Sequence, residues 1–176
     1  ITAACVAGVL SLEDAITLVA ERGRLMGSLP AGGAMAAIFA DETAVTAAIA
    51  DCQDQVAIAA LNGPANVVIS GVATAVHRVA SLFEEQGVKV RHLTVSHAFH
   101  SPLMDSILTP FAQVAGTLSY HRPRLRLISN LTGRQVQGDE AQTAVYWRDH
   151  IRQPVRFAES VAQLIADGFT HFVEIG

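Results

Sequence analysis

Two histidines, His97 and His100, lie three residues apart in the stretch of this sequence best suited to chemistry. An alternating run from Val88 to Leu93 precedes them and is typical of a strand, and a Pro-containing turn with helical patterning follows them. Connections at the end of a strand often carry catalytic or binding groups, because the flanking scaffold fixes them and leaves them accessible. We therefore expect His97 or His100 to act chemically, with a purely structural role as the alternative.

The His-x-x-His spacing also raises the question of zinc. A tetrahedral zinc site needs more protein ligands than these two, and no cluster of Cys, His or Asp with ligand spacing lies near them in the sequence. No metal site is therefore expected. The remaining histidines are interpreted as surface or partly buried residues: His77, His92, His121, His150 and His171.

The composition indicates a globular chain with a substantial core. Of the 176 residues, 51% are hydrophobic and only 16% are charged, which excludes a disordered chain and fits one domain or a large part of one. The net charge of -4 and the lack of a basic stripe argue against nucleic acid as a partner. No apolar run is long enough for a membrane span, and Cys5 and Cys52 are too few for a disulfide framework, so a cytoplasmic location is the default. Because the sequence opens in a helical pattern and stops as a strand reaches a loop, we expect it to be part of a larger protein.

Short, regular units between Gly33 and Leu93 follow one another in the order βαββαβ. This order is typical of a ferredoxin-like fold, a small antiparallel sheet with two helices on one face. Asn62-Gly63-Pro64 supplies the turn between the two central strands. The predicted elements are strand 34–39, helix 42–52, strand 56–61, strand 67–70, helix 73–86 and strand 88–93.

The residues on either side of this unit are expected to form a larger α/β layer. Ser11 resembles the N-cap of a long helix whose apolar stripe is predicted to be Leu12, Ala15, Ile16, Val19, Ala20 and Met26. Further helices are predicted over 107–115, 145–151 and 158–166, and strands over 125–129 and 169–175. Strands separated by helices indicate a parallel sheet, so the unit at 33–93 is predicted to be inserted into an α/β layer.

Seven segments of the sequence match a known family in the right order. They are residues 1–15, Arg22-Gly23-x-x-Met26, Asn62-Gly63-Pro64, His97-Ala98-Phe99-His100-Ser101-Pro102-Leu103-Met104, Ser129-Asn130-Leu131-Thr132-Gly133, Gln153-Pro154-Val155-Arg156-Phe157 and Phe172-Val173-Glu174-Ile175-Gly176. Together they resemble the acyltransferase domain of modular type I polyketide synthases, which is related to malonyl-CoA:acyl-carrier-protein transacylases. The resemblance covers the whole chain and implies an α/β-hydrolase-like large subdomain, here 1–32 and 94–176, with a ferredoxin-like subdomain, 33–93, inserted in it.

The resemblance implies a mechanism in which His100 is the general base. In this family a serine in a Gly-His-Ser-x-Gly elbow attacks the thioester of an acyl-CoA while a histidine accepts its proton. The acyl group then moves to the phosphopantetheine thiol of an acyl carrier protein. A serine hydroxyl needs such an adjacent base, and an imidazole can take and return a proton near neutral pH. The implied partners are malonyl-CoA, the carrier protein, and the ketosynthase and linker regions of the same polypeptide. No cofactor bound to the domain itself is implied.

Arg22 matches the family arginine that holds the free carboxylate of a malonyl-type substrate, a role that suits a guanidinium fork. Asn62 is expected near the pocket, although a turn-forming role would explain it equally well. His97 and Phe99 match the His-Ala-Phe-His pattern that accompanies malonyl selection in the family, where Tyr-Ala-Ser-His accompanies methylmalonyl. The ring of Phe99 would fill the space that a C2 methyl group needs.

One departure from the family limits what this chain can do by itself. No Gly-x-Ser-x-Gly occurs in these residues, and Ser101 is interpreted as a turn or cap residue. The chain alone is therefore expected to be inactive, since it holds the base and the substrate-selecting residues without the nucleophile. Two alternatives remain at this point: a docking or scaffold module of the same fold whose site has decayed, and an editing hydrolase, against which Arg22 argues.

Overall fold

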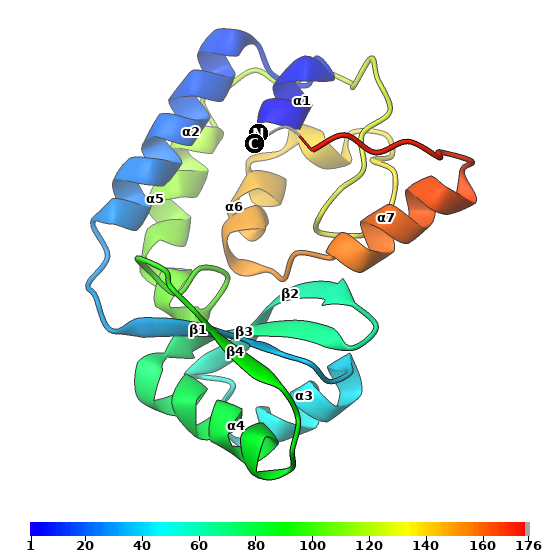
Figure 1. Cartoon of the computed structure of the whole chain (residues 1–176). Helices are drawn as coiled ribbons and strands as arrows, with labels where there is room; N and C mark the ends of the chain where they lie inside the picture. The colour runs from blue at the N-terminus through cyan, green and yellow to red at the C-terminus, as the bar shows by residue number, and fades with distance from the viewer. Residues whose placement is uncertain (175–176) are drawn as a thin grey trace.

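A four-stranded antiparallel sheet forms one layer of the structure, a computed structural model that describes residues 1–174 (Figure 1). Its strands lie in the order β2-β3-β1-β4. Two helices follow β1 and β3 in the chain, so the order βαββαβ predicted for this region is observed. The elements are β1 (Gly33–Ile38), α3 (Glu42–Ala48), the short helix η1 (Ala50–Cys52), β2 (Val56–Gly63), β3 (Asn66–Val72), α4 (Ala73–Glu85) and β4 (Val90–Leu93).

The two faces of this sheet have different partners because side chains alternate along each strand. On one face, Val67 and Ile69 of β3 pack with Val76 and Phe83 of α4 in a continuous apolar core. On the other face, Val68 packs in a separate cluster with side chains from β1 and β2 and with the partly buried Phe99. The face opposite α3 and α4 is therefore the one that meets the histidine loop.

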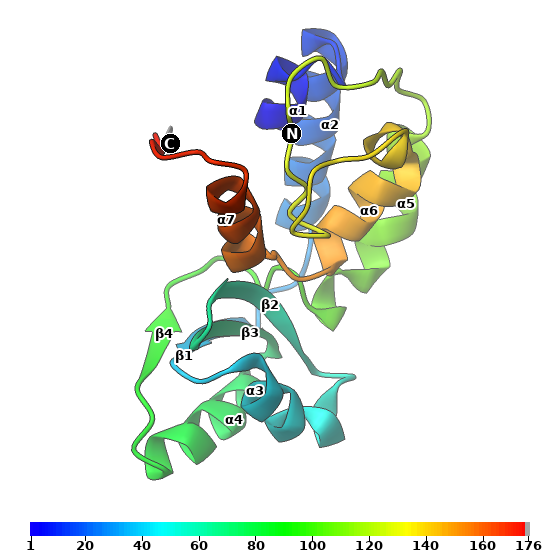
Figure 2. The ribbon, with the colours of Figure 1, turned by 90° about the vertical axis from the view of Figure 1, so that its right-hand side faces the viewer.

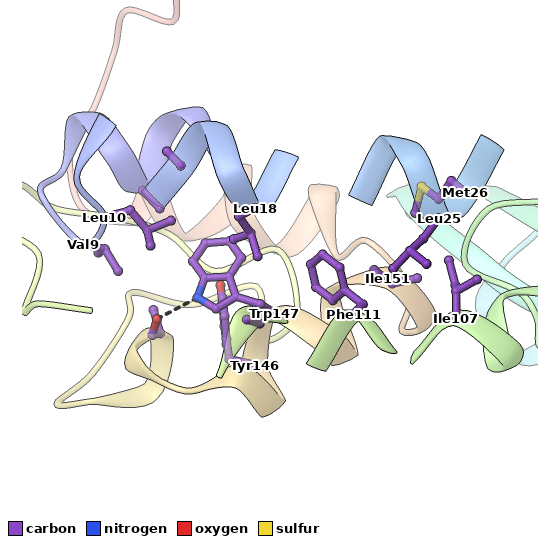
Figure 3. Close-up of a cluster of buried hydrophobic side chains, with 14 of the residues drawn as sticks. Val9, Leu10, Leu18, Leu25, Met26, Ile107, Phe111, Tyr146, Trp147 and Ile151 are labelled. Carbon is purple, nitrogen blue, oxygen red and sulfur yellow. Dashed lines mark hydrogen bonds between the residues drawn. The ribbon is translucent and has the colours of Figure 1, made fainter. Parts of the chain in front are cut away.

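The second layer is a group of helices, α1 (Thr2–Val6), α2 (Leu12–Gly27), α5 (Asp105–Ala115), α6 (Ala144–Arg152) and α7 (Phe157–Ala166), with short helices η2 (Pro102–Met104) and η3 (Glu140–Gln142). Its core lies between α2, α5 and α6, where Leu18, Phe111 and Ile151 are almost fully buried (Figure 3). The indole N–H of Trp147 donates to the carbonyl of Ala141 at 3.1 Å, so the one buried polar atom of this ring has a partner.

Helix α2 begins as predicted, but it buries a different face. The Ser11 side chain accepts a hydrogen bond from the backbone N–H of Asp14 at 3.0 Å, which confirms the N-cap. Within the predicted stripe, Ala15 and Met26 are buried, whereas Leu12, Ile16 and Val19 are 62%, 56% and 51% exposed. The helix has apolar residues on two faces, and contact with α5 selects the face that carries Leu18 and Leu25.

The two strands predicted outside residues 33–93 are not formed. Residues 125–129 make only an isolated antiparallel bridge between Ile128 and Gln135, and residues 169–174 are irregular; the predicted end of that second strand, at 175, lies outside the described residues. A strand requires a neighbour to bond with, and within residues 1–174 no parallel sheet is present to supply one. The predicted parallel sheet is therefore wrong for the described chain, and the wider assignment to an α/β-hydrolase-like layer stays a prediction.

One short parallel bridge connects the two layers. Val155, between α6 and α7, accepts a hydrogen bond from the N–H of Leu61 at 2.9 Å and donates to the carbonyl of Ala59 at 2.8 Å. Figure 2 shows α7 next to β2, with this connection above the sheet. No helix among residues 1–174 has both the length and the apolar composition needed to cross a membrane.

Candidate functional site

His100 is held in an unusual backbone conformation by its own loop. Its φ is 57°, and it is the one non-glycine residue of the described chain with a positive φ. The next residue, Ser101, is fully buried; its hydroxyl donates to the carbonyl of Ala98 at 2.7 Å and accepts from the N–H of Leu103 at 3.2 Å. Ser101 thus caps η2, as predicted. A left-handed conformation in a residue with a side chain costs free energy and persists where the surroundings require it, which is common at functional sites.

The imidazole of His100 has a defined tautomer. Its Nδ1 lies 2.8 Å from the carbonyl oxygen of Gln153, and since a carbonyl can only accept, Nδ1 carries the proton. Nε2 then keeps its lone pair. Burial lowers the pKa of His100 and the charge of Arg22 adds to this effect, while the hydrogen bond to Gln153 opposes it. The ring is therefore neutral at neutral pH and able to accept a proton at Nε2.

A pocket of about 510 Å³ joins His100 to Arg22 and Phe99. The three side chains come from α2 and from the loop after β4, and the rest of the lining is supplied mainly by the sheet face opposite α3 and α4. These further residues are Met26, Met35, Ala59, Ala60, Val68, Leu93, Val95 and Val155. The pocket is thus an apolar cavity with one cation and one neutral imidazole in its wall.

Arg22 is half-buried and has no carboxylate partner among residues 1–174. Burial lowers its pKa, although a guanidinium remains charged at neutral pH. The contrast with Arg24 in the same helix is clear, because Arg24 makes two hydrogen bonds, of 2.8 and 2.6 Å, to the carboxylate of Glu21. A partly desolvated cation without an acidic partner favours a bound anion, and a carboxylate matches its two parallel donors.

His150 lies near this pair, a position that its sequence context did not indicate. It stacks on Trp147 with ring centroids 6.1 Å apart at 19°. Burial, followed by the charge of Arg22, lowers the pKa of His150 to about 4. His150 was interpreted as a surface or partly buried residue, and it is half-buried. The available signal was its place on α6, one turn before Gln153 and one turn after the buried Tyr146 and Trp147.

Two predicted site residues do not line this pocket. The Nε2 of His97 lies 3.1 Å from the carbonyl of Leu29, in a separate cavity of about 180 Å³, although its ring centroid is 6.2 Å from that of Phe99. Asn62 is exposed at the end of β2 and lines another groove, of about 540 Å³, with Phe157 and Ile165 of α7. The structure therefore brings Arg22, Phe99 and His100 together, places His97 behind Phe99, and leaves Asn62 apart. Within residues 1–174 no group of His, Cys, Asp and Glu side chains could hold a metal ion.

Comparisons with known proteins show the family to which this chain is similar. The family model "Acyl transferase domain" matches residues 1–176. The chain is 53% identical over its full length to mycoketide-CoA synthase of Mycobacterium tuberculosis, of which it spans 4%. Among solved structures, the acyltransferase domain of the second module of the salinomycin polyketide synthase shares 49% identity, with a TM-score of 0.91 over 94% of this chain and 38% of that one. The malonyl-CoA:acyl carrier protein transacylase FabD of Xanthomonas oryzae shares 36% identity, with a TM-score of 0.85 over 96% of this chain and 55% of that one.

Proposed function

The chain belongs to the acyl transferase domain family, and we propose that it provides the base and the carboxylate-binding part of a malonyl-CoA:acyl-carrier-protein acyltransferase within a polyketide synthase. The homologues support a place within a polyketide synthase, because the relatives that the chain matches are large polyketide synthases. The chain spans a small part of each. In this proposal residues 33–93 form the small subdomain, and residues 1–32 and 94–176 belong to the large one.

The observation that carries the proposal is the guanidinium of Arg22, which has no carboxylate partner among residues 1–174 and lies in the same pocket as His100. An acyl group that ends in a methyl would gain nothing from a cation in an apolar cavity. A malonyl group carries a carboxylate that can accept two charge-assisted hydrogen bonds from Arg22. These bonds compensate for the hydration that the guanidinium loses on burial. The site therefore favours a dicarboxylic acyl group over a simple acyl chain.

His100 supplies the proton transfers of the reaction. Nε2 accepts the proton of the family's elbow serine while the serine oxygen forms a bond to the thioester carbon. The C–S bond to coenzyme A then breaks, and the leaving thiolate takes up the proton from Nε2, which restores the neutral ring. In the second half, Nε2 accepts the proton of the phosphopantetheine thiol, whose sulfur attacks the acyl-serine ester, and the proton returns to the serine oxygen. The hydrogen bond from Nδ1 to Gln153 keeps the ring in the tautomer that both steps use.

Phe99 supports malonyl over methylmalonyl as the extender. Its ring lies in the pocket wall with Arg22 and His100 and packs against the sheet face that carries Val68. A C2 methyl group would compete with this ring for space. One methyl group is worth about 1–3 kcal/mol in an apolar pocket, so the expected discrimination is about 10–200-fold.

The test uses the full-length domain, including the residues that precede Ile1 in the parent protein. Purified domain is incubated briefly with malonyl-CoA, and intact mass spectrometry measures the fraction that carries one malonyl group. Acetyl-CoA serves as the matched substrate without a carboxylate, and we expect a malonyl adduct in clear excess over an acetyl adduct. A folded domain that forms neither adduct would contradict the proposal and favour the docking or scaffold alternative.

A further inference from the structure

The residues that connect α6 to α7 carry the carbonyl that holds His100. After Gln153, the backbone is fixed by Val155, which bonds to the edge of β2, and by the N–H of Arg156, which donates to the carbonyl of Asn130 at 2.9 Å. Before it, the N–H of Gln153 donates to the carbonyl of Asp149 at 2.8 Å. The Gln153 carbonyl is therefore anchored through its own chain on both sides.

One side-chain contact ties this segment directly to the segment that bears His100. The Nε of Arg152, the last residue of α6, donates to a carboxylate oxygen of Asp105 at 2.7 Å. Asp105 begins α5, one short helix after His100. The ion pair thus joins Arg152, which immediately precedes Gln153, to Asp105, which lies in the segment that continues from the His100 loop.

This pair is poorly explained as a stabilising contact. Arg152 is 26% exposed and Asp105 is 56% exposed, and an ion pair with that much solvent contributes little to folding. The left-handed backbone of His100, in contrast, needs support from its surroundings if the imidazole is to stay in one orientation. A contact that fixes the spacing of the two segments would provide such support.

We propose that Asp105 and Arg152 are positioning residues for His100: their ion pair sets the distance between the imidazole and the Gln153 carbonyl, and so keeps the proton on Nδ1 and the lone pair on Nε2. The inference deepens the proposed acyl transfer and rests on it for its kinetic test. Neither side chain lines the pocket, so substrate binding is expected to be unaffected by changes in the pair.

The variant Arg152→Gln separates positioning from simple electrostatics. Removing a nearby positive charge would by itself raise the pKa of His100. Losing the hydrogen bond to Gln153 would lower it, because that bond favours the protonated ring. The other charged or titratable groups around His100 are Arg22 from α2 and His150 from α6, and both stay unchanged in this variant. The direction of the shift therefore identifies the cause.

The kinetic experiment compares full-length domains in malonyl transfer across a range of pH. For Arg152→Gln and Asp105→Asn we expect kcat to fall about tenfold with KM for malonyl-CoA little changed, and the acid limb of the pH profile to move to lower pH. Arg152→Lys, which keeps the charge, should recover most of the rate. The matched control is Arg148→Gln, which removes an arginine of the same helix whose partner is Asp149. An acid limb that moves to higher pH in Arg152→Gln, or an equal loss in Arg148→Gln, would overturn the proposal.

A second measurement keeps the inference separate from the proposed function. Ring nitrogen NMR of the full-length domain, with His100 assigned by comparison with His100→Ala, reports the tautomer without any substrate. The wild type should show the proton on Nδ1, and Arg152→Gln should show a mixture of tautomers. If the wild type transferred no malonyl but the tautomer still depended on Arg152, acyl transfer would be refuted and positioning supported. An unchanged tautomer in Arg152→Gln would refute positioning whatever the activity.

Discussion

The guanidinium of Arg22 and the imidazole of His100 line the same apolar pocket, and the charge of Arg22 adds to burial in lowering the pKa of His100. The positive charge of Arg22 disfavours a proton on His100, so the ring stays available as a base. Binding of a carboxylate at Arg22 would offset that charge and raise the proton affinity of His100. Under the proposed function, substrate binding and base strength would therefore be coupled in this pocket.

Replacement of the base should slow the first chemical step. We expect His100→Ala in the full-length domain to reduce the rate of malonyl adduct formation by about 10²–10⁴-fold, the usual contribution of a positioned general base. Rapid-quench mass spectrometry measures this rate. His97→Ala is the control, because His97 bonds to the carbonyl of Leu29 outside the pocket and should have a much smaller effect. A His100→Ala rate close to that of wild type would show that another group accepts the proton.

Replacing Arg22, the cation of the pocket, should slow transfer of the charged malonyl group more than transfer of the uncharged acetyl group. Arg22→Ala is expected to cost about 2–5 kcal/mol in kcat/KM for malonyl-CoA, the range for removing one partner of a buried charge pair. The cost for acetyl-CoA should be far smaller. Arg24→Ala is the matched control, since Arg24 is 65% exposed and pairs with Glu21. Equal losses for the two substrates would mean that Arg22 does not bind the carboxylate.

A smaller residue at position 99 should relax extender selection. Phe99→Ser, combined with His97→Tyr to reproduce the alternative motif, removes a ring from the pocket wall and changes the side chain behind it. The preference for malonyl over methylmalonyl should shrink without a clean inversion, because one methyl group is worth only about 1–3 kcal/mol. Competition between the two CoA esters gives the ratio of their kcat/KM values.

The single variants divide this effect between the two residues. Since His97 lines a separate cavity, Phe99→Ser alone should produce most of the change and His97→Tyr alone little of it. The Phe99→Ser domain is also expected to lose stability, by up to about 3–5 kcal/mol if the cavity does not collapse. A ratio that is unchanged in a folded, active double variant would place selection at other residues.

The stability of the domain should depend on His150 below neutral pH. Burial and the charge of Arg22 lower the pKa of His150 to about 4 from its usual value of 6.5, so the unfolded state binds a proton more readily than the folded state between these values. This contribution to stability is complete above the unfolded pKa and is lost as pH falls towards the folded one. From about pH 7 to about pH 5 the expected loss is about 2 kcal/mol.

Urea unfolding of the full-length domain at the two pH values tests this dependence. His150→Gln cannot titrate in this range, so its stability should fall less between the two conditions than that of wild type. His77→Gln is the control, because His77 is an exposed histidine of α4. The prediction fails if wild type and His150→Gln lose the same free energy of unfolding between the two pH values.

The sequence by itself determined the features that depend on neighbouring residues. The Ser11 cap, the turn residue Ser101 and the βαββαβ order of residues 33–93 were all predicted, because capping, turn chemistry and side-chain alternation act over a few positions. The motif around His100 was recognisable for the same reason. The sequence did not predict how these local elements pack against one another.

Only the tertiary structure decided which of the predicted side chains share a site. Arg22 and His100 come from distant elements, and their common pocket exists because α2 and the histidine loop both end against the sheet face opposite α3 and α4. Asn62 also lies in a matching motif, but it is at the C-terminal end of β2 and lines a different groove. The buried face of α2 was likewise set by α5, and residues 125–129 lacked a strand to pair with. Each outcome depends on contacts between residues far apart in the chain, which local propensity does not encode.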